Sequence, residues 1–186
     1  MYKLGTLAVV RTIAHAELVG QPVASALREL DTEGVVGVAS IDPNLSDTAA
    51  FCERYEVPLD RAANCVVLEA KRGDATWLAA CVVLGDTRAD VNGLVRKQLD
   101  ARRVSFAPMS RATAESGMEY GAITPVGLPR AWHILIDKTV VETECLVIGS
   151  GVRSSKLVLP GAFLATLPNV QVLQDLGRPA SVDTKI

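Results

Sequence analysis

The sequence has few of the residues that build metal centres, disulfide frameworks and common catalytic sets. Histidine occurs twice and cysteine four times, and no two cysteines have C-x-x-C spacing. We therefore expect no metal, no disulfide framework and no other cofactor. The chain also lacks a G-x-S-x-G element, and two histidines offer little from which to form a catalytic triad.

Long apolar runs and a strong net charge are missing too. No apolar run reaches the roughly 18–20 residues that span a bilayer, and residues 1–3 lack the pattern of a signal peptide. We expect a cytoplasmic protein without membrane contact. The formal charge of −2 argues against a protein that coats DNA or other nucleic acid non-specifically, although local basic clusters can still contact RNA. The sequence leaves a homo-oligomer open.

What the chain does have is apolar residues of small and medium size. Its 186 residues are 49% apolar and 22% charged, with only 4% aromatic. This length suits one domain over residues 1–186. We expect its core at about 18–173 and a polar, mobile tail at 177–186. A core of Val, Leu, Ile and Ala is typical of strands packed on helices.

Apolar periodicity and turn residues predict the order of the elements. Helices are expected at 18–30, 46–55, 90–99 and 110–116, with a short one after Pro160. A hairpin is predicted from residues 65–70 and 77–84, joined by a turn at 71–74. Further strands are predicted at 35–41, 103–106, 133–136, 140–141, 145–148, 157–159 and 170–172. Because tight turns join most strands, a mixed, largely antiparallel sheet with helices packed against it is favoured.

Two glycine-bearing loops are candidates for chemistry. One spans residues 121–127, with Gly121, Pro125 and Gly127, and the other is the Gly149-Ser150-Gly151 turn after a predicted strand. Glycines let a backbone approach a ligand closely and present its N–H groups. Such donors can hold a carbonyl oxygen as it becomes an oxyanion. The alternative is that both are ordinary turns.

Charged residues gather in a few places along the chain. Basic residues cluster at 96–103, at 71–72, and at Arg153 with Lys156. Such clusters are ordinarily solvated faces, and the alternative is a footprint for an RNA end. Asp137 and Lys138 follow a predicted strand and are interpreted as a solvated turn.

The order of these features resembles the YbaK/EbsC-like prolyl-tRNA editing domains over about residues 20–173. The match comprises the hairpin, the helix with Asp90 and Asn92, the G-x-x-x-P loop from Gly121 to Pro125, and the 149–151 turn. The resemblance implies a mixed, partly barrel-like sheet surrounded by helices. It also implies a hydrolase that acts in trans on the ester of a mischarged tRNA, with the aminoacylated 3′ end as its partner. Water would be the nucleophile, assisted by the tRNA ribose hydroxyl.

The same resemblance implies roles for particular residues. The catalytic set would be Gly121, Thr124, Pro125, Gly149, Ser150 and Gly151, in which the first loop contacts the aminoacyl carbonyl and the turn lines the same pocket. The substrate-binding set would be Asn64, Cys65, Ile123, Arg153 and Lys156. This chemistry depends on positioning and on oxyanion donors more than on a strong nucleophile.

Three positions depart from the family pattern. Many members have a lysine on the first hairpin strand, where this chain has Asn64 and Cys65. Gly149 stands where some members have serine, and Lys156 where some have aspartate. We therefore hypothesise that Lys156 supplies the phosphate or carboxylate contact of the absent lysine. The alternative is a non-catalytic module that binds an aminoacyl or small amino-acid-like ligand in the same pocket.

Overall fold

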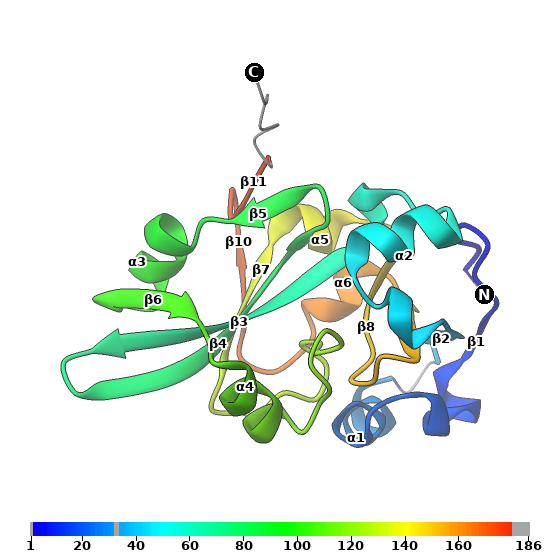
Figure 1. The fold of residues 1–186 in the computed structure, drawn as a ribbon, viewed down its shortest axis with the longest axis horizontal. Coiled ribbons are helices and arrows are strands. Elements are labelled where there is room, and N and C mark those ends of the chain that lie inside the picture. The colour runs from blue at the N-terminus through cyan, green and yellow to red at the C-terminus, as the bar shows by residue number, and fades with distance from the viewer. Residues whose placement is uncertain (1, 32–33, 180–186) are drawn as a thin grey trace.

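Two main β-sheets and a small third one form the centre of the fold in a computed structural model that describes residues 2–31 and 34–179 (Figure 1). The five-stranded sheet has the order β10 (Val170–Leu173), β7 (His133–Asp137), β4 (Ala75–Leu84), β3 (Ala63–Arg72) and β6 (Arg103–Phe106). The four-stranded sheet has the order β1 (Val9–Arg11), β2 (Gly37–Ser40), β9 (Ser155–Leu159) and β8 (Leu146–Gly149). The third sheet pairs β11 (Gly177–Pro179) with β5 (Thr87–Ala89).

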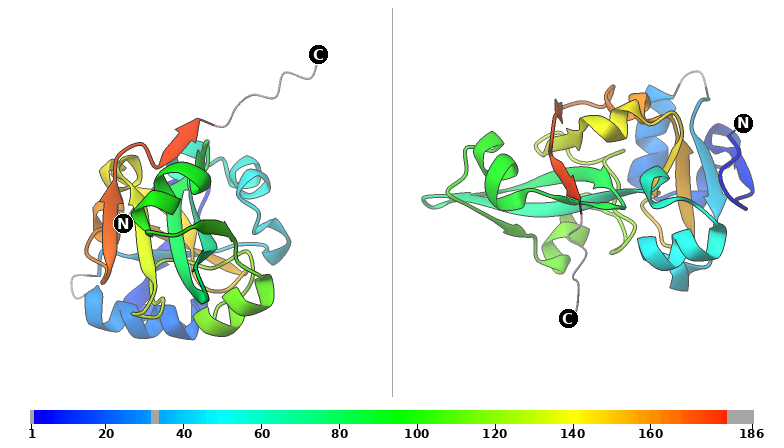
Figure 2. Two further views of the ribbon diagram at one scale, coloured as in Figure 1. Left: turned by 90° about the vertical axis from the view of Figure 1, so that its left-hand side faces the viewer. Right: turned by 90° about the horizontal axis from the view of Figure 1, so that it is seen from above.

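The predicted hairpin is confirmed, and its two strands are the longest of the described strands. β3 and β4 pair from Ala63 opposite Leu84 to Arg72 opposite Ala75. Gly73 closes the turn with a positive φ of 59°, a conformation that glycine adopts without steric cost. The distal half of the hairpin, with β6 and α3 (Arg96–Gln98) beside it, extends away from the rest of the molecule (Figures 1 and 2).

The sheets are mixed, as predicted, because β7 runs parallel to both β4 and β10 while the other pairs are antiparallel. They do not close into a barrel, so the barrel-like part of the expectation is not met among the described strands. The two large sheets meet at a parallel bridge between Ala62 and Val147. This bridge brings the start of β3 alongside β8, which places residues from both sheets around one opening.

The helices lie around the sheets. Their bounds are α1 (Gln21–Leu30), α2 (Thr48–Tyr55), α4 (Met109–Ser116), α5 (Lys138–Glu142) and α6 (Gly161–Leu164). The α1 helix buries Val23 and Leu27 in the main core, together with apolar residues of β4, β7, β8 and β9. A second cluster on the opposite face of the hairpin includes Leu68, Cys81 and Leu135. None of the described helices combines the length and apolar character that crossing a membrane requires.

The region around Asp137 differs from the sequence prediction. Asp137 is only 2% exposed, and its carboxylate accepts hydrogen bonds from the N–H of Thr139 and of Gly177. It therefore caps α5, so residues 140–141 are helical and not a strand. The predicted solvated turn at Asp137 is wrong for the same reason: the carboxylate is taken up by backbone donors.

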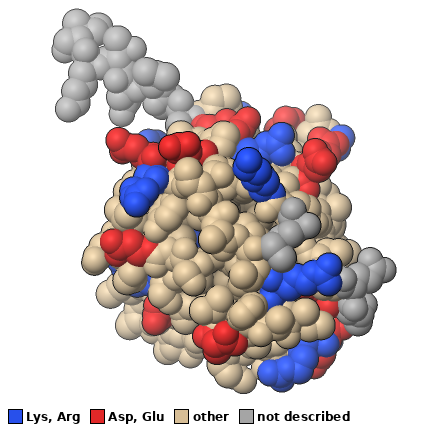
Figure 3. All heavy atoms as spheres, turned by 90° about the vertical axis from the view of Figure 1, so that its right-hand side faces the viewer, with Lys and Arg blue, Asp and Glu red and all other residues tan. Residues whose placement is uncertain are grey.

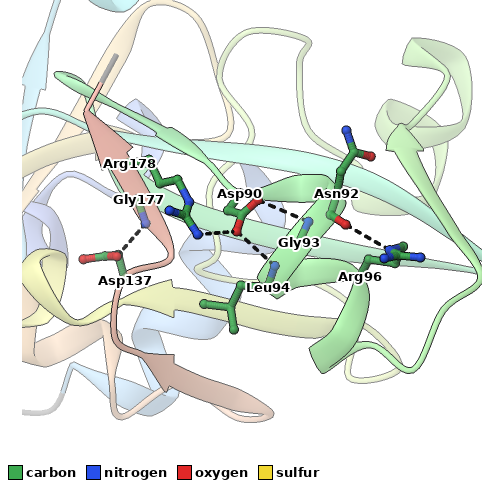
Figure 4. A network of polar contacts seen from close by, with 8 residues as sticks. All are labelled: Asp90, Asn92, Gly93, Leu94, Arg96, Asp137, Gly177 and Arg178. Atoms are coloured by element: carbon green, nitrogen blue, oxygen red, sulfur yellow. Dashed lines mark hydrogen bonds and ion pairs between the residues drawn. The ribbon is translucent and has the colours of Figure 1, made fainter. Parts of the chain in front are cut away.

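The strand β11 is held by Asp137 and by a second carboxylate, that of Asp90 (Figure 4). Asp90 accepts from the N–H groups of Gly93 and Leu94 at the start of a π-helical turn, Val91–Val95, and pairs with Arg178 on β11 at 2.9 Å. The ordered chain thus extends past the predicted core limit of 173. The predicted mobile tail overlaps β11 at 177–179, and its remainder lies outside the described residues.

Candidate functional site

A cleft of about 560 Å³ opens between the two large sheets. This volume is in the range of sites that hold small ligands. Its lining comes from the start of β3, the segment before α2, the β6–α4 junction, the 120–123 loop and the β8–β9 end. The lining residues are Asn44, Ser46, Asp47, Thr48, Ala63, Asn64, Cys65, Val66, Val67, Phe106, Ala107, Met109, Ala112, Tyr120, Gly121, Ile123, Gly149, Arg153 and Lys156.

The two glycine loops lie against each other at this cleft. Gly151 donates its N–H to Ala122 O at 2.8 Å and accepts from Glu119 N at 2.9 Å. The approach is so close that a Cβ on Gly149 would lie 2.5 Å from Ala122 O. Only glycine fits there without moving the neighbouring backbone. Two loops that are far apart in the sequence therefore contribute to one wall.

The backbone N–H groups of these loops differ in whether they already donate a hydrogen bond within the protein. The N–H of Gly151 is used in joining the loops. Those of Gly121 and Ile123 have no hydrogen-bond acceptor within residues 2–31 and 34–179, and both residues line the cleft. Gly121 adopts a φ of +82°, which orients this backbone in a way that most other residues resist. Gly121 and Ile123 are thus loop residues that line the cleft and have N–H groups without an acceptor among the described residues.

Four residues of the predicted catalytic set lie outside the cleft lining: Gly151, described above, and Thr124, Pro125 and Ser150. Thr124 and Pro125 belong to the same loop as Gly121, but both are buried. The Thr124 hydroxyl has no hydrogen-bond partner among the described residues. Ser150 is fully buried, with its Oγ 3.0 Å from Val152 O, 2.9 Å from Ser155 O and 2.8 Å from Ser155 Oγ. These contacts hold the turn between β8 and β9 in shape.

Lys156 is the most unusual side chain of the site. It lies on β9 opposite Gly149 and is only 7% exposed. Its Nζ donates to Ser46 O at 3.0 Å and sits 5.4 Å from the centre of the Phe51 ring. No carboxylate of the described residues forms an ion pair with it. Burial is the main cause that lowers the pKa of Lys156 from its usual value.

The positions that depart from the family pattern share one wall. Asn64 and Cys65 follow the Ala62–Val147 bridge, so they run alongside the end of β8 at Gly149, which pairs with Lys156. Asn64 accepts a hydrogen bond from Thr48. Burial raises the pKa of the Cys65 thiol far above neutrality, so this group is not a ready nucleophile.

Arg153 marks the edge of the same wall. Its backbone N–H donates to the Glu119 carboxylate at 2.6 Å, and its guanidinium donates to Pro43 O from Nε at 3.2 Å and Nη2 at 3.0 Å. Arg153 also lines the cleft, where the family resemblance predicts contact with the substrate. The cleft therefore places two cationic groups, Arg153 and Lys156, close to the unpaired loop N–H groups.

The sequence analysis missed two parts of the lining. One is the segment 44–48 before α2, which supplies the carbonyl of Ser46 that holds Lys156. The other is the exposed rim of Phe106, Met109 and Tyr120. Neither shows a motif, because both depend on which elements meet at the cleft. No group of three His, Cys, Asp or Glu residues in the described part of the chain is placed to hold a metal ion.

Comparisons with known proteins fit this geometry. The model of the aminoacyl-tRNA editing domain matches residues 42–167, which include the whole cleft lining. No curated protein sequence matches the chain. The crystal structure of a candidate trans-editing enzyme for prolyl tRNA synthetase has a TM-score of 0.71 at 15% identity, covering 86% of this chain and 96% of its own. That of the hypothetical protein APE2540 has a TM-score of 0.71 at 17% identity, covering 85% and 100%. The chain belongs to the family of aminoacyl-tRNA editing domains.

Proposed function

We propose that the protein hydrolyses the ester of mischarged aminoacyl-tRNA in trans, with the 560 Å³ cleft as its active site. The observation that carries this proposal is a buried lysine without a carboxylate partner beside two unpaired backbone donors. Burying such a charge costs stability, and strongly perturbed groups in clefts are enriched at functional sites. The editing-domain family and the neighbour described as a trans-editing enzyme point to the same substrate.

In this mechanism the loop binds the ester carbonyl. The N–H groups of Gly121 and Ile123 donate to the carbonyl oxygen and stabilise the negative charge that develops there. Water attacks the carbonyl carbon, and the bond from that carbon to the ribose oxygen breaks. The proton released by water passes to the ribose oxygen, which yields a free amino acid and an uncharged tRNA.

Lys156 supplies a fixed positive charge to the bound 3′ end in this scheme. Its position on β9, in the same wall as Asn64 and Cys65, lets it replace the lysine that other members carry on the first hairpin strand. A cation in a poorly hydrated wall acts more strongly on a phosphate or a developing oxyanion than one in open water. Because Cys65 stays a thiol near neutrality, water is favoured over a covalent nucleophile.

A non-catalytic binding module is the second candidate. It is favoured by the replacement of the family lysine with Asn64 and Cys65, and by the absence of histidine from the cleft lining among the described residues. In that case the same wall would hold an aminoacyl group without turning it over.

A panel of mischarged tRNAs separates the two candidates. We expect release of free amino acid from one or a few tRNAs that carry a small apolar amino acid, because Ala63, Val66 and Val67 give this part of the cleft lining an apolar character. Correctly charged tRNAs serve as controls. Tight binding of mischarged tRNA with no release above the spontaneous rate would overturn hydrolysis and support the binding module.

A further inference from the structure

We propose that a strip of surface running from the cleft mouth to the hairpin end is a track for the unpaired 3′ nucleotides of RNA. On this track, the exposed side chains of Met109 and Tyr120 contact bases, and Lys71 and Arg103 contact phosphates. The inference rests on the proposed function for the identity of the RNA. It goes beyond that function by assigning residues outside the cleft interior to substrate binding.

The first observation is the apolar rim. Phe106 is 72% exposed, Met109 57% and Tyr120 59%, and all three lie in the lining of the cleft. Half of the six large hydrophobic side chains exposed in the described part of the chain are therefore at this one opening. Large apolar groups gathered in water at a binding site indicate a partner surface. Aromatic rings at such a site are suited to stacking on unpaired bases.

The second observation is a continuous face from the cleft to the hairpin end. Alternate residues of β3 share a face of the sheet, so Cys65 and Val67 in the cleft lie on the same side as Lys71. On the neighbouring strand, Lys71 is paired with Arg103. Four residues of strand from Val67 to Lys71 span about 13 Å. A few unpaired nucleotides leaving the cleft can cover this distance.

The third observation is the charge of the hairpin end. Segments 71–74 and 96–103 contain six basic residues and two acidic ones, although the whole chain has a net charge of −2. Arg72 is paired with Asp100. Lys71, Lys97, Arg102 and Arg103 are exposed and form no ion pair with any described residue. This concentration of free cations favours a polyanion over an uncharged partner.

The carboxylates that face the track do not cancel this charge. Glu69 lies between Val67 and Lys71 on the same side of β3, and it is paired with Arg111 on α4. Arg111 also binds Glu115 at 2.7 Å. At the opposite end of the molecule, acidic and basic side chains are interspersed around a largely uncharged centre (Figure 3). The carboxylate that lies on the track face is therefore neutralised by Arg111, and it leaves Lys71 and Arg103 without an ion-pair partner among the described residues.

The test measures binding of uncharged tRNA and of a short single-stranded RNA with the tRNA 3′ sequence, over a range of salt concentrations. The variant Lys71→Gln/Arg103→Gln is compared with Lys138→Gln/Arg130→Gln, which removes the same charge from exposed positions elsewhere. Loss of two phosphate contacts should reduce the salt slope for the single strand by about 1.4. We expect the control variant to keep the slope. Tyr120→Ala should weaken binding roughly tenfold.

The outcomes separate this inference from the proposed function. If the hairpin variant and its control lose the same affinity and slope, or neither loses any, the track is refuted, even if the wild type deacylates tRNA. If the wild type binds RNA with the expected dependence on Lys71, Arg103 and Tyr120 but never releases amino acid, the track stands and hydrolysis fails. Because all substituted side chains are exposed, thermal melts should coincide and confirm that the variants fold.

Discussion

Replacing Lys156 with methionine should lower kcat/KM for deacylation by about 10²-fold and at the same time stabilise the fold. Activity falls because the cleft loses its buried cation. Stability rises because methionine keeps the apolar stem beside Phe51 and removes a charge that is 7% exposed and has no carboxylate partner. A gain of about 1 kcal/mol corresponds to an increase in Tm of about 2–4 °C.

The pH dependence of stability gives this prediction a second readout. Since the folded chain has the lower lysine pKa, the unfolded chain binds the proton more tightly between the folded and the unfolded value. The free energy of unfolding of the wild type should therefore gain a rising contribution as pH increases through that window. Lys156→Met should lack this contribution, and its stabilisation should be largest below the folded pKa.

The matched control is Lys138→Met. Lys138 is exposed and forms only an i,i+4 pair with Glu142 at 3.4 Å. Its removal should change stability by less than about 0.5 kcal/mol and leave deacylation unchanged. A Lys156→Met variant with full activity would contradict the proposed role of this lysine. A variant with a lower Tm than the wild type would show that the buried lysine does not destabilise the folded state.

Substituting Gly149 with alanine should abolish most of the activity by displacing the loop that binds the carbonyl. The added Cβ would lie 2.5 Å from Ala122 O and 2.9 Å from Ile123 O, so backbone must move. Such overpacking typically costs about 1–3 kcal/mol, and a shift of about 1 Å in a positioning loop can cost 10²-fold in rate. Measurement of kcat/KM together with the free energy of unfolding tests both effects.

Gly73→Ala is the control for this substitution. Gly73 has a φ of +59° and nothing within 4 Å of a Cβ, so alanine there costs about 1–2 kcal/mol of backbone strain without a clash. Both variants should be destabilised to a similar degree, and only Gly149→Ala should lose activity. Equal activity losses in the two variants would mean that general instability, and not the position of the 121–123 backbone, explains the effect.

The fold is predictable from the sequence where local signals and long-range packing agree. The hairpin was predicted because β-branched runs flank a Lys-Arg-Gly-Asp turn, and the structure pairs the same residues. Residues 140–141 are the opposite case, because two valines predict a strand and the structure has a helix there. There the cap supplied by Asp137 and the burial of Val140 outweigh β propensity.

The candidate site was only partly predictable for a similar reason. The two glycine loops could be singled out from their composition, and the structure brings Gly121, Ile123 and Gly149 to one cleft. That Ser150 points into the turn, and that Phe106 and Tyr120 stay exposed, depends on the sheet order and on the Ala62–Val147 bridge. No local pattern encodes such contacts between distant segments.

The most direct test of the central claim is a crystal structure with a hydrolysis-resistant analogue, an aminoacyl group linked by an amide to the 3′ position of adenosine. We predict the carbonyl oxygen within hydrogen-bond distance of the Gly121 or Ile123 N–H, with Lys156 in the same wall of the cleft. A bound analogue with its carbonyl directed away from the 121–123 loop, or bound outside this cleft, would contradict the account.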